Sequence, residues 1–389
     1  MIDRELFSAD HELFRATVRR FVEEEVAPHH AQWEEEGKVP RAIWRRAGEL
    51  GLLCCNLPEE YGGAGCDWLY NVVVIEEFWR AGMSGPGAGF MVHSEMVAPY
   101  ILAWGSEELK QSWLPRMVKG EVIGAIGMTE PGAGSDLKNI RTRAVRDGDD
   151  YVIDGQKVYI SNGQNCDIIV LATKTDMAAK SRGMSLILVE ADRPGFVKGR
   201  SLSKIGLRAQ DTAELFFEGV RVPVANRLGE EGQGFGMLMQ KLAHERLSQA
   251  VRSIMVCEAA IGWTVDYTRQ REAFGGTLAD FQNTQFVLAQ LEAETSALRV
   301  FTDWCITRFL AGKLDPVDAA KAKLTVTDLQ CKVVDQCLQL FGGYGYILEY
   351  PIARAYTDAR ITRIAGGAAE VMKQIIGRDL FAKAGGTRA

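Results

Sequence analysis

Hydrophobic positions in the first third of the chain recur with the spacing of helices. One such face begins behind Asp10, a residue type that favours the helix N-cap, and continues to Pro28, which we expect to end the helix. Its apolar members are Leu13, Phe14, Val18, Phe21, Val22 and Val26. Similar patterns predict helices over residues 41–52, 68–80 and 107–118. We therefore expect an N-terminal α-helical domain over residues 1–121.

Between residues 122 and 231 the pattern changes to short apolar runs separated by turns. The runs are VIGAIGM, YVIDGQKVYI, CDIIVLAT, MSLILVE and AELFFEGVRV. Asp154-Gly155 is a dipeptide typical of a two-residue hairpin, so it divides the second run into two predicted strands. The pattern predicts an antiparallel β-domain, either a barrel or a sandwich.

Helical periodicity returns after the glycine-rich segment 229–236 and continues almost to the end of the chain. It predicts a C-terminal helical-bundle domain over residues 232–389. The order helices, strands, helices predicts an α+β multidomain protein. It excludes a βαβ nucleotide-binding fold, and no GxGxxG motif follows a predicted strand.

Composition narrows the class of protein. The 389 residues are 47% hydrophobic, enough for large buried cores, and the net charge of -6 argues against nucleic-acid binding. The eight cysteines lack zinc-binding spacings, so we expect no metal and free thiols in a reducing compartment. The acidic N-terminal segment is unlike a signal or transit peptide, and no apolar run approaches the ~20 residues of a membrane helix. We expect a cytoplasmic protein without membrane insertion.

Three segments carry residues suited to chemistry. Residues 127–136, GMTEPGAGSD, form a glycine-rich loop that offers backbone N–H groups and hydroxyls to a polar ligand. Residues 157–163, KVYISNG, put an aromatic ring and a hydroxyl on one strand face, which suits a wall beside a planar ligand. Residues 339–346, QLFGGYGY, interrupt a helical region and precede Glu349, Arg354 and Asp358. On composition alone, a turn, a surface strand and a structural Arg–Asp pair are simpler explanations.

Together these segments resemble the two signature patterns of the acyl-CoA dehydrogenase family. TEPGAGSD and QLFGGYGY…E…R…D match both patterns at every defined position, and the resemblance covers nearly the whole chain. The family's α-domain, β-domain and second α-domain agree with the periodicity. The resemblance implies bound FAD and oxidation of a fatty acyl-CoA, as in β-oxidation, to the trans-2-enoyl-CoA.

The resemblance also implies roles for individual residues. Ile126, Met128 and Thr129 are expected along the flavin, with Thr129 hydrogen-bonded to the ring. Tyr159 takes the place of a flavin-stacking aromatic residue, commonly Trp, and Ser161 that of a hydroxyl near flavin N5. The complete expected cofactor-binding set is Ile126, Met128, Thr129, Gly134, Ser135, Tyr159, Ser161, Arg271, Phe274, Gln282, Gln339, Gly342, Gly343, Ala368 and Glu370. The expected substrate-binding residues are Ser135, Ala243, Arg246 and Gly366.

Some of these positions serve the distant half of the cofactor. By resemblance, Arg271 contacts the FAD pyrophosphate, as a guanidinium can, and Gln282 with residues 339–343 holds the adenosine from a neighbouring subunit. Many members have Thr where this chain has Ala368, and Ala368 lacks the hydroxyl that would make that one contact.

The catalytic base does not lie at the family's usual place. Most relatives carry a Glu before a Gly near the C-terminus, where this chain has Gly366. The long-chain and isovaleryl branches instead place it on an earlier helix directly before an Arg, and Glu245 before Arg246 fits that pattern, closest to the long-chain branch. We expect burial to raise the pKa of Glu245. His244 is a rival base, but helix neighbours diverge by roughly 100°, so both cannot face the flavin.

The resemblance implies an electron-transfer flavoprotein as electron acceptor and a homotetramer. It leaves long straight-chain, branched and terpenoid-type acyl groups open as substrates. Two other functions stay open: a divergent flavin oxidase resembling nitroalkane oxidase, and a non-catalytic flavin-binding protein. The last would lack a base or carry a basic C-terminal extension, whereas this chain has Glu245 and ends in FAKAGGTRA.

Overall fold

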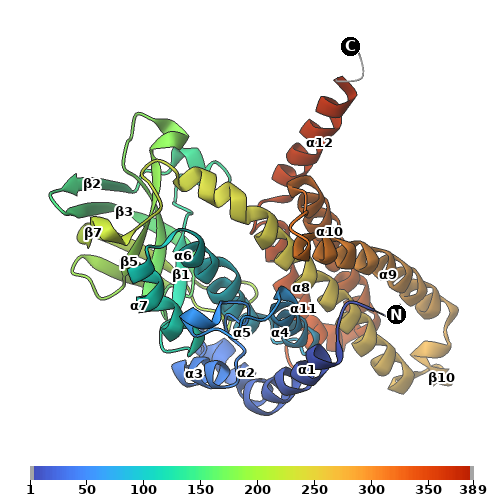
Figure 1. Ribbon diagram of the computed structural model, residues 1–389. Coiled ribbons are helices and arrows are strands. Elements are labelled where there is room, and N and C mark those ends of the chain that lie inside the picture. The colour runs from blue at the N-terminus through green and yellow to red at the C-terminus, as the bar shows by residue number, and fades with distance from the viewer. Residues whose placement is uncertain (1–3, 386–389) are drawn as a thin grey trace.

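The structure is a computed structural model that describes the backbone of residues 4–385 and the side chains of residues 4–383. The end of the FAKAGGTRA segment, residues 386–389, lies outside the described residues. Helices at the N-terminus, a β-domain and a long C-terminal helical bundle follow one another, so the α+β fold expected from the sequence is confirmed (Figure 1).

The N-terminal helices agree only in part with their predicted bounds. They are α1 (Ala9–Phe21), α2 (His30–Glu36), α3 (Arg41–Glu49), α4 (Trp68–Arg80), α5 (Ser84–Met91), α6 (Ala98–Trp104) and α7 (Glu107–Val118). The bounds of α4 and α7 were predicted correctly. The helices α5 and α6, joined by the π-helix η4 (Val92–Val97), were missed because every residue of α5 is buried, so no polar face marks a period, and α6 spans only seven residues.

Two details of the first helix were predicted wrongly. The N-cap of α1 is Ser8, whose hydroxyl accepts the His11 N–H, and not Asp10. Pro28 does not stop the helical path, because the chain continues through a π-helix, Val22–Val26, and a 3-10 turn, Ala27–His29. Pro28 stands at the start of that turn, where its missing N–H costs nothing.

The β-domain contains the strands β1 (Gly124–Gly127), β2 (Arg143–Asp147), β3 (Asp150–Ser161), β4 (Ile168–Lys174), β5 (Met184–Glu190), β6 (Phe196–Ser201), β7 (Thr212–Pro223) and β8 (Arg227–Leu228). They form one sheet in the order β6-β7-β3-β2-β4-β5-β8, with β1 beside β4. Most pairs are antiparallel, but β1 and β2 both pair with β4 in parallel.

The hairpin predicted at Asp154-Gly155 is wrong. Residues 150–161 form the single strand β3, and the chain reverses before it, around Gly148, where Asp147 pairs with Asp150. Gly155 instead lets the segment just before β2 approach closely, because a Cβ built there would lie 2.5 Å from Thr142 Oγ1. Its φ of 151° accompanies a shift of register against β7.

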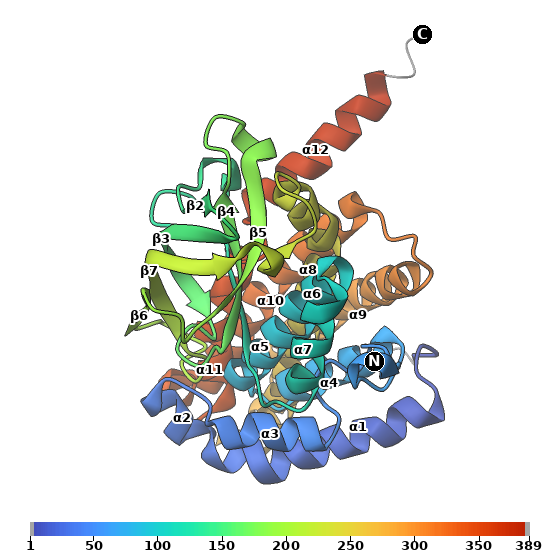
Figure 2. The same cartoon turned by 60° about the vertical axis from the view of Figure 1, so that its left-hand side comes forward.

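The C-terminal bundle contains α8 (Gly234–Gln270), α9 (Gln282–Leu310), α10 (Pro316–Phe341), α11 (Pro351–Ala359) and α12 (Ala369–Gly385), and a short hairpin, β9 (Glu272–Ala273) with β10 (Gly276–Thr277), follows α8. Helix α8 begins beside the sheet and runs past the N-terminal helices into the bundle, while α12 projects away from the body (Figures 1 and 2). No helix within the described residues is long and apolar enough to cross a membrane.

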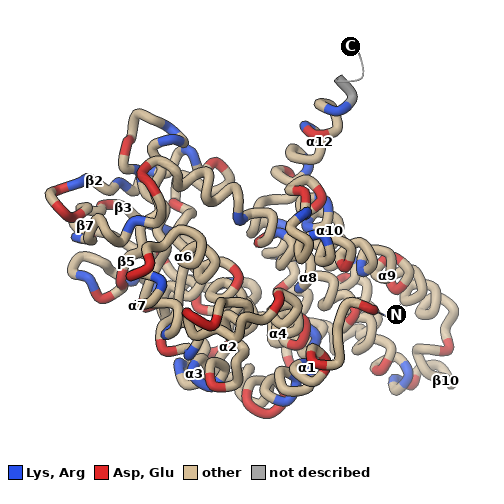
Figure 3. The backbone as a smooth tube through the Cα atoms, viewed as in Figure 1, with Lys and Arg blue, Asp and Glu red and all other residues tan. Residues whose placement is uncertain are grey.

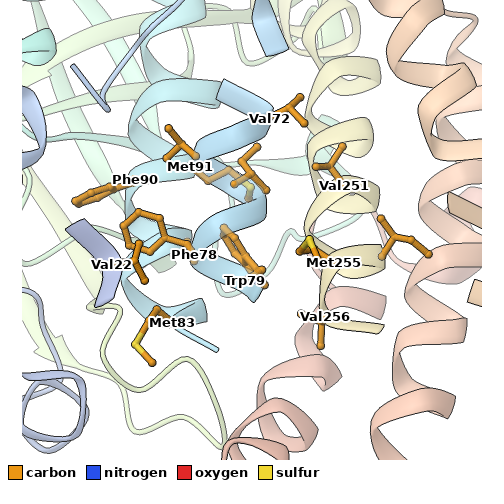
Figure 4. Packing of buried hydrophobic residues seen from close by; sticks show 14 of the residues in the cluster. Val22, Val72, Phe78, Trp79, Met83, Phe90, Met91, Val251, Met255 and Val256 are labelled. Atoms are coloured by element: carbon orange, nitrogen blue, oxygen red, sulfur yellow. The ribbon is translucent and has the colours of Figure 1, made fainter. Parts of the chain in front are cut away.

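Apolar packing joins the three parts. One cluster unites the N-terminal helices with the bundle; Trp79 of α4 lies on the side facing Val251 and Met255 of α8 (Figure 4). A second cluster joins the N-terminal helices, one side of the sheet and Leu238 at the start of α8. Acidic and basic positions are interspersed over all three parts (Figure 3). Helix α8 is therefore the element against which the other parts are positioned.

We expect Gly155→Ala to lower the free energy of unfolding by about 1–3 kcal/mol, because a methyl group would collide with Thr142 at a φ that L-residues avoid. Urea denaturation followed by circular dichroism measures it. Gly262→Ala is the control, since Gly262 lies on the exposed side of α8 with open space at Cβ. This change should raise the free energy of unfolding by about 0.5–1 kcal/mol. Equal effects of both changes would contradict the close approach.

Candidate active site

The carboxyl group of Glu245 lies in the interior, between α8 and α6. The residue is only 2% exposed. Its Oε1 accepts a hydrogen bond of 3.0 Å from the hydroxyl of Tyr100, a fully buried residue of α6. Burial raises the pKa of Glu245 above its ordinary value, and the Tyr100 hydrogen bond and the positive charges of Arg246 and Lys241 oppose this rise. The direction expected from the sequence is confirmed.

His244 faces another part of the interior. Its Nε2 lies 2.9 Å from Oε2 of Glu95, on the π-helix η4. Its ring stacks on Phe309 and meets the edge of Trp68. Burial would raise the pKa of Glu95, but His244, Trp68 and Asn71 outweigh it and lower that pKa. The two neighbouring side chains thus diverge, as helix geometry requires.

The glycine-rich loop leaves β1 and is held by a buried carboxylate. Glu130 accepts the backbone N–H groups of Arg141 (2.6 Å) and Thr142 (3.0 Å) and the ammonium of Lys157 (2.8 Å). Lys157 also donates to the Met128 carbonyl at 3.1 Å. Burial lowers the pKa of Lys157 to about 8, although Glu130 opposes this shift. The pair fixes the loop without using the loop's outer residues.

Those outer residues stay accessible. Ile126, Met128 and Thr129 are half-buried, and Gly134 and Ser135 are exposed. A hydrogen bond of 2.9 Å from Val158 N–H to the Thr129 carbonyl joins this loop to β3. The structure therefore brings the first predicted segment next to the second.

The second segment presents its aromatic ring outwards. Tyr159 has a φ of 61°, unusual for a residue with a side chain, at a bulge where β3 shifts register against β7. Its side chain is 68% exposed, and Ser161 is half-buried. The bulge gives this strand a ring that no residue of the sheet covers, which is suited to stacking on a planar group.

Gly366 and Gly367 bring the C-terminal turn against α8. A Cβ on Gly366 would lie 3.2 Å from Cγ of Gln249, and one on Gly367 would lie 3.9 Å from Nε of Arg246. Lys323 donates to the Gly367 carbonyl at 2.5 Å. Of the other predicted positions, Ala243 precedes Glu245 by two residues on α8, and Ala368 and Glu370 follow Gly367. Ala243 and Ala368 are half-buried, and Glu370 is exposed.

The remaining predicted cofactor residues lie elsewhere. Arg271, just beyond α8, is 26 residues from Glu245, or about 39 Å along a helix of this length. Its guanidinium lies over the ring of Tyr344 at 5.6 Å, which brings Arg271 beside the third predicted segment. Phe274 is 98% exposed, and Gln282, Gln339, Gly342 and Gly343 are exposed. One chain therefore has two separate clusters of predicted cofactor residues.

Comparison with known proteins decides the family. Three family models match in sequence: acyl-CoA dehydrogenase, N-terminal domain (residues 8–121), middle domain (residues 125–220) and C-terminal domain (residues 232–381). The chain belongs to the acyl-CoA dehydrogenase family. It is a flavin-dependent oxidoreductase of acyl-CoA thioesters, and FAD is its cofactor.

Individual relatives agree over almost the entire chain. The mitochondrial long-chain specific acyl-CoA dehydrogenase of Sus scrofa is 47% identical over 97% of this chain and 88% of its own. The crystal structure of acyl-CoA dehydrogenase from Geobacillus kaustophilus covers 97% of this chain and 100% of its own, with 46% identity and a TM-score of 0.95. Glutaryl-CoA dehydrogenase from Mycobacterium smegmatis, in complex with FADH2, gives 30% identity and a TM-score of 0.90 over 96% and 95%.

The residues of this acyl-CoA dehydrogenase fit a large polar cofactor and its substrate. Within residues 4–383, buried polar atoms without a hydrogen-bond partner gather on α8 beside Glu245, among them Arg246 Nε and Gln249 Oε1. Gly132 and Gly134 would meet no atom within 4 Å if they carried a Cβ. Unpartnered buried polar atoms are rare in native proteins, and a bound ligand is one explanation for them.

Sequence reasoning missed several residues of this site. Tyr100 lies 145 residues from Glu245, on a helix that was not predicted. Lys157 and Lys323 are buried cations whose partners are a carboxylate and a carbonyl from distant segments. No signal in the sequence pairs these residues, since the contacts arise only from packing. The predicted Arg354–Asp358 pair is not formed in the described structure: Asp358 accepts the Leu207 N–H, and Arg354 donates to the Leu348 carbonyl.

We expect Glu130→Gln to destabilise the protein by about 3 kcal/mol and to weaken FAD retention, because it leaves the buried Lys157 ammonium without a counter-charge. Thermal unfolding and the flavin content after gel filtration measure these effects. Glu214→Gln removes a carboxylate from the exposed Arg200 pair and should change neither. Full flavin retention in Glu130→Gln would contradict the role assigned to the pair.

Proposed function

We propose that this enzyme oxidises a long-chain or branched acyl-CoA to the trans-2-enoyl-CoA, with Glu245 as the base that removes the Cα proton. The observation that carries the proposal is the Glu245 carboxylate, buried beside Tyr100 on the helix that contacts the Gly366 turn. A buried carboxylate is a stronger base than one in water, and burial of the reacting atoms keeps water from competing for the proton.

Each residue has a distinct task in this mechanism. Tyr100 occupies Oε1 of Glu245 and so leaves Oε2 as the atom that receives the proton. The backbone N–H of Gly366 is suited to donate to the thioester carbonyl, where negative charge develops as the proton leaves. Arg246 and Ala243 lie on the same helix and are suited to place the thioester, with Ser135 nearer its phosphates. Bound FAD supplies the acceptor for the hydride that leaves Cβ.

We assign the cofactor contacts to two groups. One chain contributes the half around the sheet and the C-terminal turn, with Ile126, Met128, Thr129, Gly134, Ser135, Tyr159, Ser161, Ala368 and Glu370. A second copy contributes Arg271, Phe274, Gln282, Gln339, Gly342 and Gly343. The separation of about 39 Å between Glu245 and Arg271 supports this division.

The same division supports an assembly, which we propose to be a homotetramer. Phe274 and Tyr346 are 98% and 89% exposed, and Leu380 and Phe381 are exposed on the projecting helix α12 (Figures 1 and 2). Large exposed apolar side chains are typical of interfaces. We further propose electron-transfer flavoprotein as the electron acceptor, and the cytoplasm as the compartment, which the eight free cysteines support.

The substrate class can be determined by anaerobic titration of the flavoprotein with straight-chain, isovaleryl and citronellyl thioesters, following the visible absorbance of the flavin. The thioester that bleaches it most efficiently identifies the class. If none bleaches it, dehydrogenation is refuted. Rapid reoxidation of the reduced flavin by oxygen, with no effect of CoA thioesters, would then favour a flavin oxidase. A flavin that no substrate reduces would favour a non-catalytic binding protein.

We expect Glu245→Gln to lower the rate of flavin reduction by about 100- to 10,000-fold, while FAD and the thioester still bind, because the variant has no base. Stopped-flow absorbance measures the rate. His244→Gln is the matched control on the same helix and should retain the rate within about tenfold. Rapid bleaching by Glu245→Gln would remove Glu245 as the base, and loss in His244→Gln alone would transfer the role to His244.

Tyr100→Phe tests how the base is tuned. The hydroxyl stabilises ionised Glu245, so its loss raises the pKa of that carboxyl further, and the acidic limb of the kcat/KM profile should move to higher pH by about one unit. The kcat/KM of Tyr100→Phe should therefore fall below that of wild type mainly at pH values under the acidic limb, and should approach the wild-type value above it. Tyr61→Phe removes the same group from a hydrogen bond to the remote Glu107 and should leave the limb in place. Identical profiles for both variants would contradict the tuning.

A further inference from the structure

Helix α8 carries an unusual run of buried polar groups beyond the base. Gln249, Arg252 and Ser253 are 3%, 3% and 0% exposed. Gln249 Oε1, Arg252 Nε and Ser253 Oγ have no hydrogen-bond partner among the described residues. Buried polar atoms cost free energy unless something pairs with them, so the structure calls for a group that these side chains can bind.

Arg252 is the charged residue among the three. Its Nε is buried and has no hydrogen-bond partner within the part of the chain that the structure describes. The ring of Trp79 lies 5.5 Å from its guanidinium carbon (Figure 4 shows Trp79). Burial lowers the pKa of Arg252 to about 10. The negative charge of Asp358 opposes this fall of the pKa, and the Asp358 carboxylate already accepts the Leu207 N–H.

The position of Arg252 relates it to the reaction. Seven residues separate it from Glu245, which is nearly two turns, so both start from the same face of α8 about 10 Å apart. Gln249, between them, contacts the Gly366 turn. An acyl chain that reacts at Glu245 and follows this face reaches Arg252. A purely aliphatic chain there would keep water from the guanidinium without pairing with it, whereas a carboxylate could accept two parallel N–H bonds.

We propose that the acyl group oxidised by this enzyme carries a second carboxylate at its far end, bound by the Arg252 guanidinium with help from the Ser253 hydroxyl. The preferred substrate is then the mono-CoA thioester of a dicarboxylic acid. The inference rests on the proposed function, because it assumes that the thioester lies at Glu245. With C–C bonds of about 1.5 Å, the distance along α8 favours acyl chains of about eight to twelve carbons.

The test compares thioesters of matched length with and without the terminal carboxylate. For wild type we expect kcat/KM to favour the dicarboxylic thioester by about 10- to 100-fold, as a charged hydrogen-bonded pair would. Arg252→Met should lose that preference and leave the monocarboxylic thioester unchanged or improved. No preference in wild type, or an equal loss for both thioesters in Arg252→Met, would overturn the proposal and leave ordered water as the partner of Arg252.

Thermal unfolding of the substrate-free holoenzyme separates a ligand-binding role from a structural one. An unpaired buried charge does not stabilise a fold, so Arg252→Met should keep or raise the Tm. Arg299→Met is the matched control, because Arg299 is equally buried but pairs with Glu258 and Glu76, and it should lower the Tm. A comparable fall of the Tm in Arg252→Met would show that Arg252 has a structural partner within the protein, and would overturn the proposal.

Binding on the Glu245→Gln background distinguishes this inference from the proposed function. That variant does not consume the thioester, so affinities follow from the flavin spectrum. Tighter binding of the dicarboxylic thioester that Arg252→Met abolishes, without bleaching of the wild type by any thioester, would support the site and refute dehydrogenation. Bleaching by thioesters of every length without a carboxylate preference would support dehydrogenation and refute the role of Arg252.

Discussion

The candidate site depends on one carboxylate, that of Glu245, being held away from water. Glu245 is stabilised in the interior by a single hydroxyl, that of Tyr100, and by positive charges on its own helix. Such a group is tolerated only where rigid elements enclose it, because an ionised carboxylate is costly to bury. Helix α8 supplies this rigidity: it packs against the N-terminal helices and the bundle, and its first turns against the sheet.

Besides apolar packing, close backbone contacts bring parts of the chain together around this helix. Gly366 and Gly367 allow the C-terminal turn to reach α8, and Gly155 allows β3 to pass Thr142. Buried ion pairs hold the edges of the site, as Glu130 and Lys157 do for the glycine-rich loop. These contacts fix the walls of the site while its outer residues, such as Tyr159, remain available to a ligand.

Periodicity predicted the order of the domains and the bounds of several helices, among them α4 and α7. It failed where local signals conflicted with packing. Asp154-Gly155 has the composition of a turn, but pairing with β2 and β7 extends the strand through it. The helix α5 is buried all round, so it has no polar side from which a period can be recognised, and α6 has only seven residues.

The sequence by itself determined the family, the flavin chemistry and the candidate base, because motifs such as TEPGAGSD and the pair Glu245-Arg246 are continuous in the chain. Only the tertiary structure decided what surrounds that base. Tyr100, Lys323 and Arg252 come from separate helices or separate turns, and whether each finds a partner depends on how those helices pack. Hydrogen bonding and burial are properties of three-dimensional neighbours, so a one-dimensional pattern does not contain them.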